Sequence, residues 1–492
     1  MGNHPDPLAE VLRLIAVKAG GVRSCHPRAM ATATLTADLL RRYDRAGPRY
    51  TSYPAAPHFS TAFDERAFRE AARETNGDPI PRPLSLYVHV PFCTSPCFYC
   101  GCNRIITRDK SRAGPYLASL YREIDLAAGM FDRDREVVQL HFGGGTPNFL
   151  SPPELRDVVE TLRRHFRFSE SNERDLSIEL DPRTIDAAGV RELADIGFNR
   201  ASLGVQDFDP AVQAAVNRIQ SVEQTVEVIE ACRRHGMRSV NVDLIYGLPK
   251  QSLDGFGATL DTVVASRPDR LAVYGYAHLP RLFVAQRRIA TAALPPPERK
   301  LELLMLAIDR LTAAGYVYIG MDHFALPGDE LAIAREAGTL HRNFMGYTTH
   351  AESDLVGFGV SAISHVGPTF SQNARDLAAW QAAIGDGRLP ISRGMRMSGD
   401  DVVRADVIQR IMCNGEVPVR EVERRHGIVF AAYFRNALQA LGPMAQDGLV
   451  HVGNDRIAVS SQGRLLLRNI AMCFDAYLDR PATAPVQFSR AI

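Results

Sequence analysis

Four of the eight cysteines in this chain stand close together, with types and spacing that suit metal chemistry: Cys93, Cys97, Cys100 and Cys102. The first three form a CxxxCxxC array, and clustered thiolates of this kind bind zinc or iron–sulfur clusters. A structural zinc site or a ferredoxin-type cluster needs a fourth ligand. Cys102 follows Cys100 too closely to reach around a cubane. Three thiolates on a four-iron cluster leave one iron open, and an open metal position is where catalysis occurs.

A second candidate motif is the glycine-rich run Gly143-Gly-Gly-Thr-Pro147, which directly follows an apolar segment. Glycine lets the backbone approach a ligand closely, and the surrounding amides and carbonyls can hold charged groups. On its own such a run is also typical of an ordinary turn. Because it ends the next predicted strand after the cysteines, we interpret the two motifs as parts of one site.

The elements that position these motifs alternate between strands and helices from about residue 83. Apolar strands are predicted at 84–90, 137–142, 176–180, 201–205, 240–245 and 271–276. Helices are predicted at 116–127, 153–165, 222–235, 252–264 and 298–312, and a seventh strand-like run at 316–321. Repeated β–α units predict a parallel sheet buried on both faces, and six or more indicate a barrel or an open part of one.

Polar, glycine or cysteine residues stand at or just after the end of nearly every predicted strand. Besides the two motifs they are Glu179, Asp181 and the segments 206–208, 243–249 and 276–280. In a parallel barrel these positions share the C-terminal rim, where active sites lie. This convergence indicates a site more strongly than any single motif does.

Composition excludes some classes of protein. The 492 residues carry a net charge of +1, which favours neither nucleic-acid binding nor an acidic membrane surface. No apolar run reaches the roughly 18 residues of a membrane-spanning helix, and no convincing signal peptide is present. We therefore expect a cytoplasmic enzyme without membrane insertion. The scattered Cys232, Cys413 and Cys473 are interpreted as small buried hydrophobes.

The predicted domain organisation has five parts. Residues 1–30 are left unassigned, 31–82 form an N-terminal arm, 83–335 the barrel, 336–380 a connecting segment and 381–492 a mainly helical C-terminal domain. In the last part, helical runs near 400–413 and 419–440 precede a β-hairpin at 449–460, which indicates a winged-helix-like unit. Because it has no clear basic stripe, we interpret it as a packing or lid domain rather than a DNA-binding one.

The cysteine array after the first strand and the glycine-rich run after the second resemble the radical S-adenosylmethionine (SAM) superfamily. Within it, the chain resembles the oxygen-independent coproporphyrinogen III oxidase family from about residue 39 to its C-terminus. The signatures that carry this resemblance are Arg-Tyr-Thr-Ser-Tyr-Pro at 49–54, Cys-Gly-Cys-Asn at 100–103, Gly-Val-Gln-Asp-Phe at 204–208, Asp-Leu-Ile-Tyr-Gly-Leu-Pro at 243–249, Gly-Met-Asp-His-Phe-Ala at 320–325 and His-Arg-Asn-Phe at 341–344.

The resemblance implies an α/β fold with an incomplete parallel (βα)6-type radical SAM barrel. It also implies a [4Fe–4S] cluster on Cys93, Cys97 and Cys100, with SAM on the open iron. A 5′-deoxyadenosyl radical would then convert two propionates of coproporphyrinogen III to vinyl groups, giving protoporphyrinogen IX in haem biosynthesis. The cofactor carries the difficult chemistry. An unidentified electron donor and acceptor are implied as partners, and a monomer is expected.

The resemblance also assigns residues position by position. The first SAM would contact Tyr87, Gly144, Glu179 and Ile363, so the connecting segment contributes to the site. A second SAM, which is either a co-reactant or overlaps the substrate site, would contact Tyr99, Gly145, Thr146, Gln206, Arg218, Asp243 and Ala277.

The catalytic candidates are Tyr87, His89 and Cys102. Tyr87 and His89 are two residues apart on one strand and point to the same face. Without the resemblance, His89 reads as a core histidine, Arg218 as a surface arginine and Asp243 as a helix cap. Cys102 is either a buried thiol or a contact to the substrate or the electron acceptor.

The sequence leaves alternatives for the role of the arm arginines and for the function of the whole chain. Arginines of the arm, Arg41, Arg42 and Arg49, are candidates for the substrate carboxylates, or else belong to a solvated face. The chief alternative function is a radical-SAM-like haem-binding chaperone without oxidase activity. Such relatives generally lack Cys102 with Asn103, the 49–54 arm and the 320–325 element. A DNA-binding regulator would require salt-dependent duplex binding.

Overall fold

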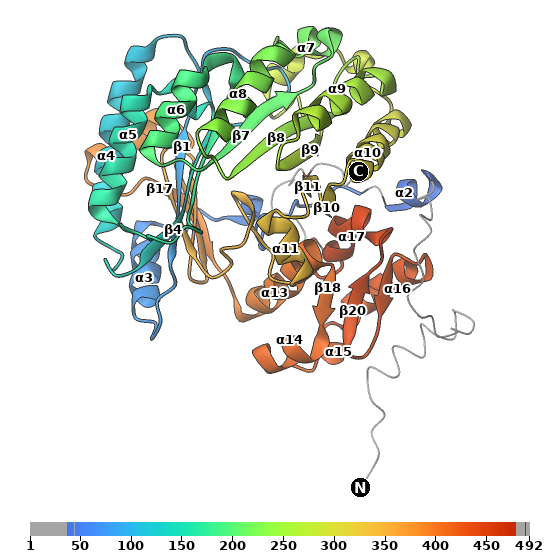
Figure 1. Ribbon diagram of the computed structural model, residues 1–492. Coiled ribbons are helices and arrows are strands. Elements are labelled where there is room, and N and C mark those ends of the chain that lie inside the picture. The colour runs from blue at the N-terminus through green and yellow to red at the C-terminus, as the bar shows by residue number, and fades with distance from the viewer. Residues whose placement is uncertain (1–36, 44, 479–487, 489–492) are drawn as a thin grey trace.

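The computed structural model describes residues 37–43, 45–478 and 488 (Figure 1). The unassigned segment 1–30, the start of the arm and Cys25 lie outside the described residues. A large α/β unit, coloured from blue through green and yellow to the light orange of β17 (Ile391–Arg396), packs beside a smaller C-terminal unit in orange-red and red. No helix among the described residues is long and apolar enough to cross a membrane.

The six expected strands are confirmed as neighbours in one parallel sheet. They are β1 (Leu84–Val90), β4 (Glu136–Gly144), β6 (Asp175–Leu180), β7 (Arg200–Gln206), β8 (Ser239–Tyr246) and β9 (Arg270–Gly275). Helices cover the outer face of the sheet, as Figure 1 shows: α4 (Ala113–Ala128), α5 (Pro152–His165), α6 (Ala187–Ile196), α8 (Val222–Arg234) and α9 (Leu253–Ser266).

The sheet continues beyond these strands at both ends. Next to β1 lies β14 (Asp354–Phe358), parallel to it, followed by the antiparallel strands β15 (Ile363–Val366), β16 (Thr369–Asn373) and β17 (Ile391–Arg396). At the other end β11 (His323–Ala325) and β10 (Val317–Gly320) form an antiparallel hairpin beside β9. The run predicted at 316–321 is thus a strand in an edge hairpin. Because β10 and β17 end the strand order, the barrel is incomplete, as expected.

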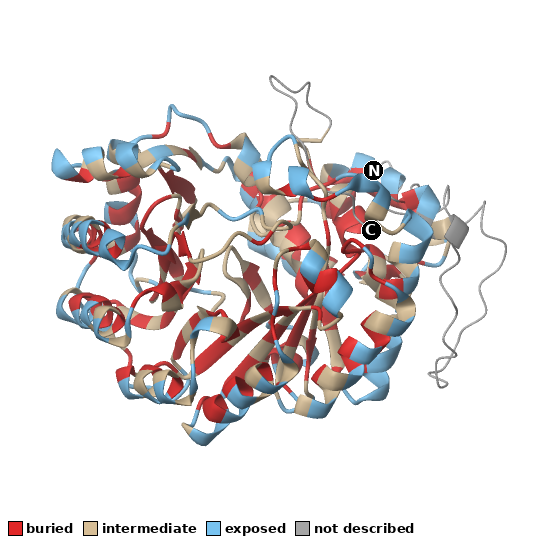
Figure 2. Ribbon diagram, turned by 90° about the horizontal axis from the view of Figure 1, so that it is seen from above, coloured by how far each residue is buried: buried red, intermediate tan, exposed pale blue. Residues whose placement is uncertain are grey.

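Alternation along the strands separates two environments. On β1, the apolar Leu86 and Val88 belong to the main hydrophobic core, whereas Tyr87 and His89 point to the opposite face. Figure 2 shows buried residues concentrated in the strands and on the inner sides of the helices. The helix-facing side of the sheet supplies the core, and the other side is available for polar groups.

The C-terminal unit has its own core, to which Tyr43, Tyr50 and Tyr53 of the arm contribute. The expected hairpin is confirmed as β19 (Val450–Val452) and β20 (Arg456–Val459), and β18 (Glu416–Pro418) completes a three-stranded sheet. The helical run predicted near 419–440 is not continuous, because Gly427 ends α14 (Val419–His426) in a left-handed conformation. Cys232 and Cys413 are buried as expected, whereas Cys473 is only partly buried. The elements of this unit are α13 (Gly399–Asn414), β18 (Glu416–Pro418), α14 (Val419–His426), α15 (Phe430–Tyr433), α16 (Arg435–Gln446), β19 (Val450–Val452), β20 (Arg456–Val459) and α17 (Leu467–Met472).

Candidate active site

The cysteine loop leaves the end of β1 and is held by its own backbone and one arginine. The short strands β2 (Phe92–Cys93) and β3 (Ile105–Ile106) pair at its base. Arg104 donates from one guanidinium nitrogen to the carbonyl of Cys100, 3.2 Å away, and from the other to that of Cys97, 3.1 Å away. The loop is therefore fixed in shape by contacts within itself.

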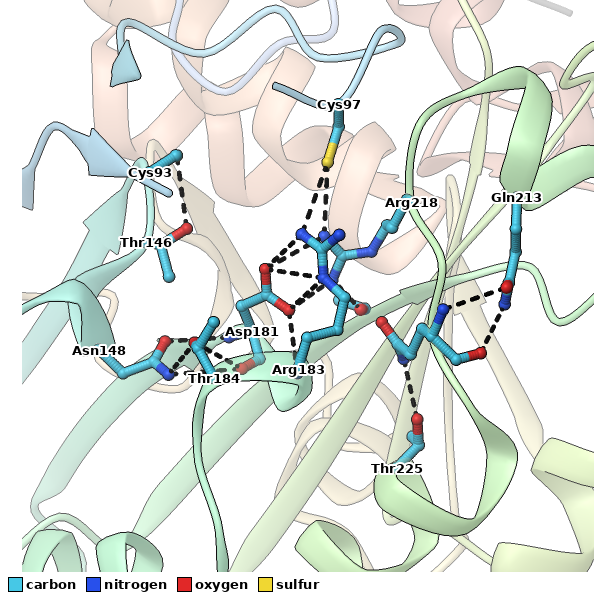
Figure 3. A network of polar contacts seen from close by, with 12 residues as sticks. Cys93, Cys97, Thr146, Asn148, Asp181, Arg183, Thr184, Gln213, Arg218 and Thr225 are labelled. Carbon is cyan, nitrogen blue, oxygen red and sulfur yellow. Dashed lines mark hydrogen bonds and ion pairs between the residues drawn. The ribbon is translucent and has the colours of Figure 1, made fainter. Parts of the chain in front are cut away.

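All three predicted cluster ligands are free thiols that receive hydrogen bonds at sulfur. Thr146 Oγ1 donates to Cys93 Sγ over 3.4 Å, Arg218 Nη1 to Cys97 Sγ over 3.5 Å, and the Cys102 amide to Cys100 Sγ over 3.4 Å. Figure 3 shows the first two contacts. Donors aimed at sulfur favour thiolates, the form that binds metal.

The donor set of the loop fits a [4Fe–4S] cluster. Each of the three thiols has a hydrogen-bond donor at its sulfur, and the thiolates of such a cluster each bind a different iron, so they need not converge on one point. Burial raises the pKa of Cys93 to about 11 despite the Thr146 donor. Metal binding would favour the thiolate form of this residue.

Next to Cys97 lies a cationic network (Figure 3). Arg183 Nη2 and Arg218 Nη2 contact the Asp181 carboxylate at 2.6 and 3.4 Å. Burial would raise the pKa of Asp181, but the two guanidinium groups hold it below its usual range. Two cations against one carboxylate leave positive charge beside the Cys97 sulfur. Arg218 is buried, so its interpretation as a surface arginine is wrong.

Tyr87 and His89 form a hydrogen-bonded chain that ends on the cysteine loop. His89 Nε2 lies 2.9 Å from the Asn103 carbonyl oxygen, which only accepts, so this nitrogen carries the proton. In the neutral ring Nδ1 then accepts from the Tyr87 hydroxyl, 3.0 Å away. Burial lowers the pKa of His89 and favours that neutral ring. A Cβ on Gly144, where φ is 116°, would lie 2.6 Å from the imidazole, so the close approach requires glycine.

Glu179 stands at the rim end of β6. Its carboxylate accepts from the Gly144 amide over 3.2 Å and faces His141 Nε2 at 3.5 Å. Burial alone would raise the pKa of Glu179, but His141 and the amide hold it below its usual range. His141 also stacks on Tyr87 with ring centroids 5.9 Å apart. Our sequence reasoning missed His141, although strand alternation places it on the same face as Gly143.

The remaining predicted residues lie around the same rim. Asp243 accepts from Asn241 over 2.8 Å and Ser202 over 3.1 Å inside the barrel, so the helix-cap interpretation is wrong. Burial, reinforced by the charge of Glu179, raises its pKa to about 7. Gln206, the last residue of β7, has a positive φ of 71°. A Cβ on Gly204 would meet both Gln206 and Arg218, so these two side chains meet over that glycine.

Four more predicted positions, Tyr99, Ala277, Ile363 and Gly145, lie next to the rim. Gln286 Nε2 donates to the carbonyls of Tyr99, over 2.9 Å, and Ala277, over 3.2 Å, which ties these two loops together. Ile363 reaches the site because its carbonyl lies over Gly357, the residue that pairs with Tyr87. Gly145 approaches the Pro91 backbone so closely that a Cβ would lie 2.7 Å from it. Cys102 is exposed, so its interpretation as a buried thiol is wrong.

Comparison with known families agrees with this geometry. The Radical SAM superfamily model matches residues 87–263, and the HemN C-terminal domain model matches residues 397–466. Fold and site together therefore define a radical SAM protein, whose cofactors are a [4Fe–4S] cluster and SAM.

Individual relatives show which family within the radical SAM superfamily the chain resembles. The oxygen-independent coproporphyrinogen III oxidase of Pseudomonas aeruginosa is 50% identical, over 93% of this chain and 98% of that protein. That of Escherichia coli K12 is 46% identical, over 92% and 98%. The solved structure of coproporphyrinogen III oxidase (HemN) from Escherichia coli, a radical SAM enzyme, superposes with a TM-score of 0.84 and 46% identity, covering 87% of this chain and 97% of that one. The chain belongs to the oxygen-independent coproporphyrinogen III oxidase family.

Proposed function

We propose that this chain converts two propionates of coproporphyrinogen III to vinyl groups without oxygen, giving protoporphyrinogen IX. The observation that carries the proposal is a three-cysteine loop over a polar barrel interior, in a chain that matches named oxidases over nearly its whole length. A cytoplasmic location, a monomeric state and the absence of nucleic-acid binding belong to the same proposal.

The protein's part is to hold the cofactors and the substrate. When bound, the cluster and SAM supply radical chemistry that removes a hydrogen atom from the propionate β-carbon, after which CO₂ and one electron leave. Cys93, Cys97 and Cys100 would bind three irons. Arg104 and Arg218, at the loop carbonyls and at Cys97 Sγ, place positive charge around these ligands.

Glu179 and the glycine run would hold the first SAM. The ionised carboxylate has room for further donors, since 44% of its side chain is exposed, and ribose hydroxyls suit it. Tyr87, Gly144 and Ile363 surround the same part of the rim. For a second SAM, the candidates are the cationic Arg218 with Tyr99, Gly145, Thr146, Gln206, Asp243 and Ala277.

Tyr87 and His89 are proposed to position groups at the reacting centre. Because Asn103 holds the imidazole in one tautomer, the Tyr87 hydroxyl donates to His89 and turns its oxygen lone pairs outward as acceptors. The surplus thiol Cys102, two residues after Cys100, is exposed on the cluster loop and is proposed to contact the substrate or the electron acceptor.

For the substrate carboxylates, the structure favours Arg49 over the other two arm arginines. Arg41 and Arg42 pair at the surface with Glu298 and Asp447, whereas Arg49 pairs with Asp322 and packs 5.6 Å over the Tyr274 ring.

Arg342 is a further candidate from the structure. It is 5% exposed, and its Nε and Nη1 have no hydrogen-bond partner in the described part of the chain. Its guanidinium stacks 5.1 Å over Tyr347, whose ring lies 5.1 Å from that of His323 on β11. Because a buried guanidinium without an anion is costly, we propose that Arg342 binds a propionate together with Arg49.

Product analysis tests the proposed function. Cluster-reconstituted protein is incubated anaerobically with SAM, dithionite and coproporphyrinogen III, with the Cys93→Ser variant as control. The expected result is a divinyl product from the unaltered chain alone. Stable haem binding with no vinyl product would contradict the oxidase and favour the chaperone alternative.

A further inference from the structure

His141 is a strand residue that lies between two residues assigned to SAM by the proposed function. It stands on β4, beside Tyr87 of β1 in the register of the sheet and beside Ser177 of β6 on its other side. Paired positions on adjacent strands point to the same face, and Glu179, two residues after Ser177, shares that face. His141 therefore has a proposed SAM contact on each side.

The imidazole reaches Glu179 through space that a glycine leaves open. A Cβ on Gly143 would lie 3.1 Å from the Glu179 carboxyl carbon and 3.2 Å from His141 Nε2. Carbon atoms in ordinary contact are about 3.5–4.0 Å apart, so a methyl group here would press on both side chains. With glycine at this position, Nε2 faces Glu179 Oε1 directly, 3.5 Å away.

The ring is held on two sides. Ser177 Oγ lies 2.7 Å from His141 Nδ1. The Tyr87 ring stacks on the imidazole, with centroids 5.9 Å apart and an interplanar angle of 21°. Only 15% of the His141 side chain is exposed. These contacts direct the Nε2 edge of the ring at the Glu179 carboxylate.

The same contacts decide where the ring carries hydrogen. A bare Nε2 lone pair would face a carboxylate, and two acceptors repel each other, so Nε2 carries hydrogen. Ser177 suits both charge states of the ring, because its hydroxyl can donate to a bare Nδ1 or accept from a protonated one. When it accepts, its own hydrogen can go to the Leu140 carbonyl oxygen, 3.4 Å away. His141 is thus a donor towards Glu179 whether the ring is neutral or charged.

The Glu179 carboxylate is fixed on one side and open on the other. Oε1 faces His141, and Oε2 accepts from the Gly144 amide over 3.2 Å. A carboxylate has about four lone-pair sites, so roughly two remain after these donors. The remaining sites suit the adjacent hydroxyls of a ribose, and the exposed part of the side chain leaves room for them.

We propose that His141 is a positioning residue for SAM and acts through Glu179. It holds the carboxylate ionised and in one orientation, so that the hydroxyls of the ligand meet acceptors that are already in place. His141 itself contacts neither SAM nor the reacting atoms. The inference rests on the proposed function, because it takes Glu179 as a SAM contact.

The test measures the SAM affinity of cluster-reconstituted variants by anaerobic calorimetry. His141→Gln keeps an N–H donor at the place of Nε2, His141→Asn keeps one only at the place of Nδ1, and His141→Phe keeps the ring without either nitrogen. His141→Asn and His141→Phe should each bind SAM about tenfold more weakly, because the carboxylate loses a donor. His141→Gln should stay within about threefold of the unaltered chain.

A matched control is available in the outer helices. His165 Nε2 lies 2.7 Å from Asp125 Oδ1, so His165→Asn also removes a histidine that faces a carboxylate. This variant should bind SAM normally. Iron content is measured for every variant. Loss of the cluster in both His141→Asn and His141→Phe would overturn the proposal, because His141 would then serve the fold rather than SAM.

A double-mutant cycle with Glu179→Ala shows whether His141 acts through that carboxylate. In the absence of Glu179, His141→Asn should weaken SAM binding no further, since its partner is already gone. The proposal is overturned if His141→Asn or Glu179→Ala binds SAM normally, or if His141→Gln binds as weakly as His141→Asn. It is also overturned if the two effects add, which would make His141 a direct contact.

Failure of the proposed function would give a different result. SAM affinities in the expected order, with no vinyl product from coproporphyrinogen III in the dithionite assay, would contradict the oxidase and leave the role of His141 intact.

Discussion

Two glutamates on opposite sides of the same sheet show how position decides what a side chain does. Glu179 lies at the rim with His141 and the Gly144 amide, and 44% of its side chain is exposed. Glu123 on α4 is 2% exposed and accepts from the Gly359 amide over 2.7 Å and from Asn373 over 2.6 Å.

The environments shift the two carboxyl groups in opposite directions. His141 and the amide overcome burial and lower the pKa of Glu179. Around Glu123 burial dominates its neutral donors and raises the pKa to about 8. The rim carboxylate is therefore ionised and open to a ligand, whereas the other is neutral and holds the turn between β14 and β15, which leads into Ile363. Residues at the rim are therefore suited to ligand binding. Residues of the helix layer, meaning the outer helices and the core between them and the sheet, stabilise the fold.

The largest expected effect tests this division with cysteines. Replacing Cys93, Cys97 or Cys100 by Ser should abolish the cluster absorbance and all activity, because each sulfur is expected to bind a different iron. Cys232→Ser, in the helix layer, should keep the cluster and lower only the melting temperature. Loss of the cluster in Cys232→Ser would contradict the division between rim residues that bind cofactors and helix-layer residues that only stabilise the fold. Iron analysis and calorimetry measure the two effects.

The second largest effect is expected for Glu179, the glutamate at the rim. Glu179→Ala should weaken SAM binding by roughly tenfold or more, because hydrogen bonds to an ionised group are worth about 1.5–3 kcal/mol. The free energy of unfolding should change little, since the side chain is half exposed. Calorimetric titration with SAM gives the affinity. An unchanged affinity would remove Glu179 from the SAM site.

For Glu123 in the helix layer, the substitution is expected to change stability rather than SAM binding. Glu123→Ala should lower the free energy of unfolding by about 2 kcal/mol, because the Gly359 and Asn373 donors lose their buried acceptor. Glu123 binds its proton more tightly when folded, so its contribution is greatest below about pH 4.5 and declines as pH rises to about 8. The difference between variant and unaltered chain should therefore shrink over that range in denaturant titrations. A difference that grows with pH would contradict a neutral Glu123.

The smallest effect concerns Cys102. Cys102→Ser should keep the full iron content, because the residue is exposed, its backbone amide keeps the hydrogen bond to Cys100 Sγ, and a serine hydroxyl can replace the thiol as a donor to that sulfur. Activity should fall if Cys102 contacts the substrate or the acceptor. Collapse of the iron content would show that the three-ligand assignment is wrong.

Local patterns were enough to predict much of the fold. The six parallel strands are buried on one face and alternate in polarity, so each could be read from its own residues. The short strands β14 to β17 were missed because they lie in a segment without a clear period, and their pairing depends on partners distant in the chain. The helix at 419–440 was predicted as one element because its apolar period continues, although Gly427 interrupts it.

For the site, the sequence by itself determined the chemistry: a three-thiol ligand set, a glycine run and polar strand ends, because these depend on residue type and local spacing. Only the tertiary structure decided which side chains meet. The pairing of His141 with Glu179, and the packing of Tyr347 between Arg342 and His323, join segments that are distant in sequence. The reason is physical, since charge, burial and pKa depend on neighbours in space, and a barrel brings together residues that the chain keeps apart.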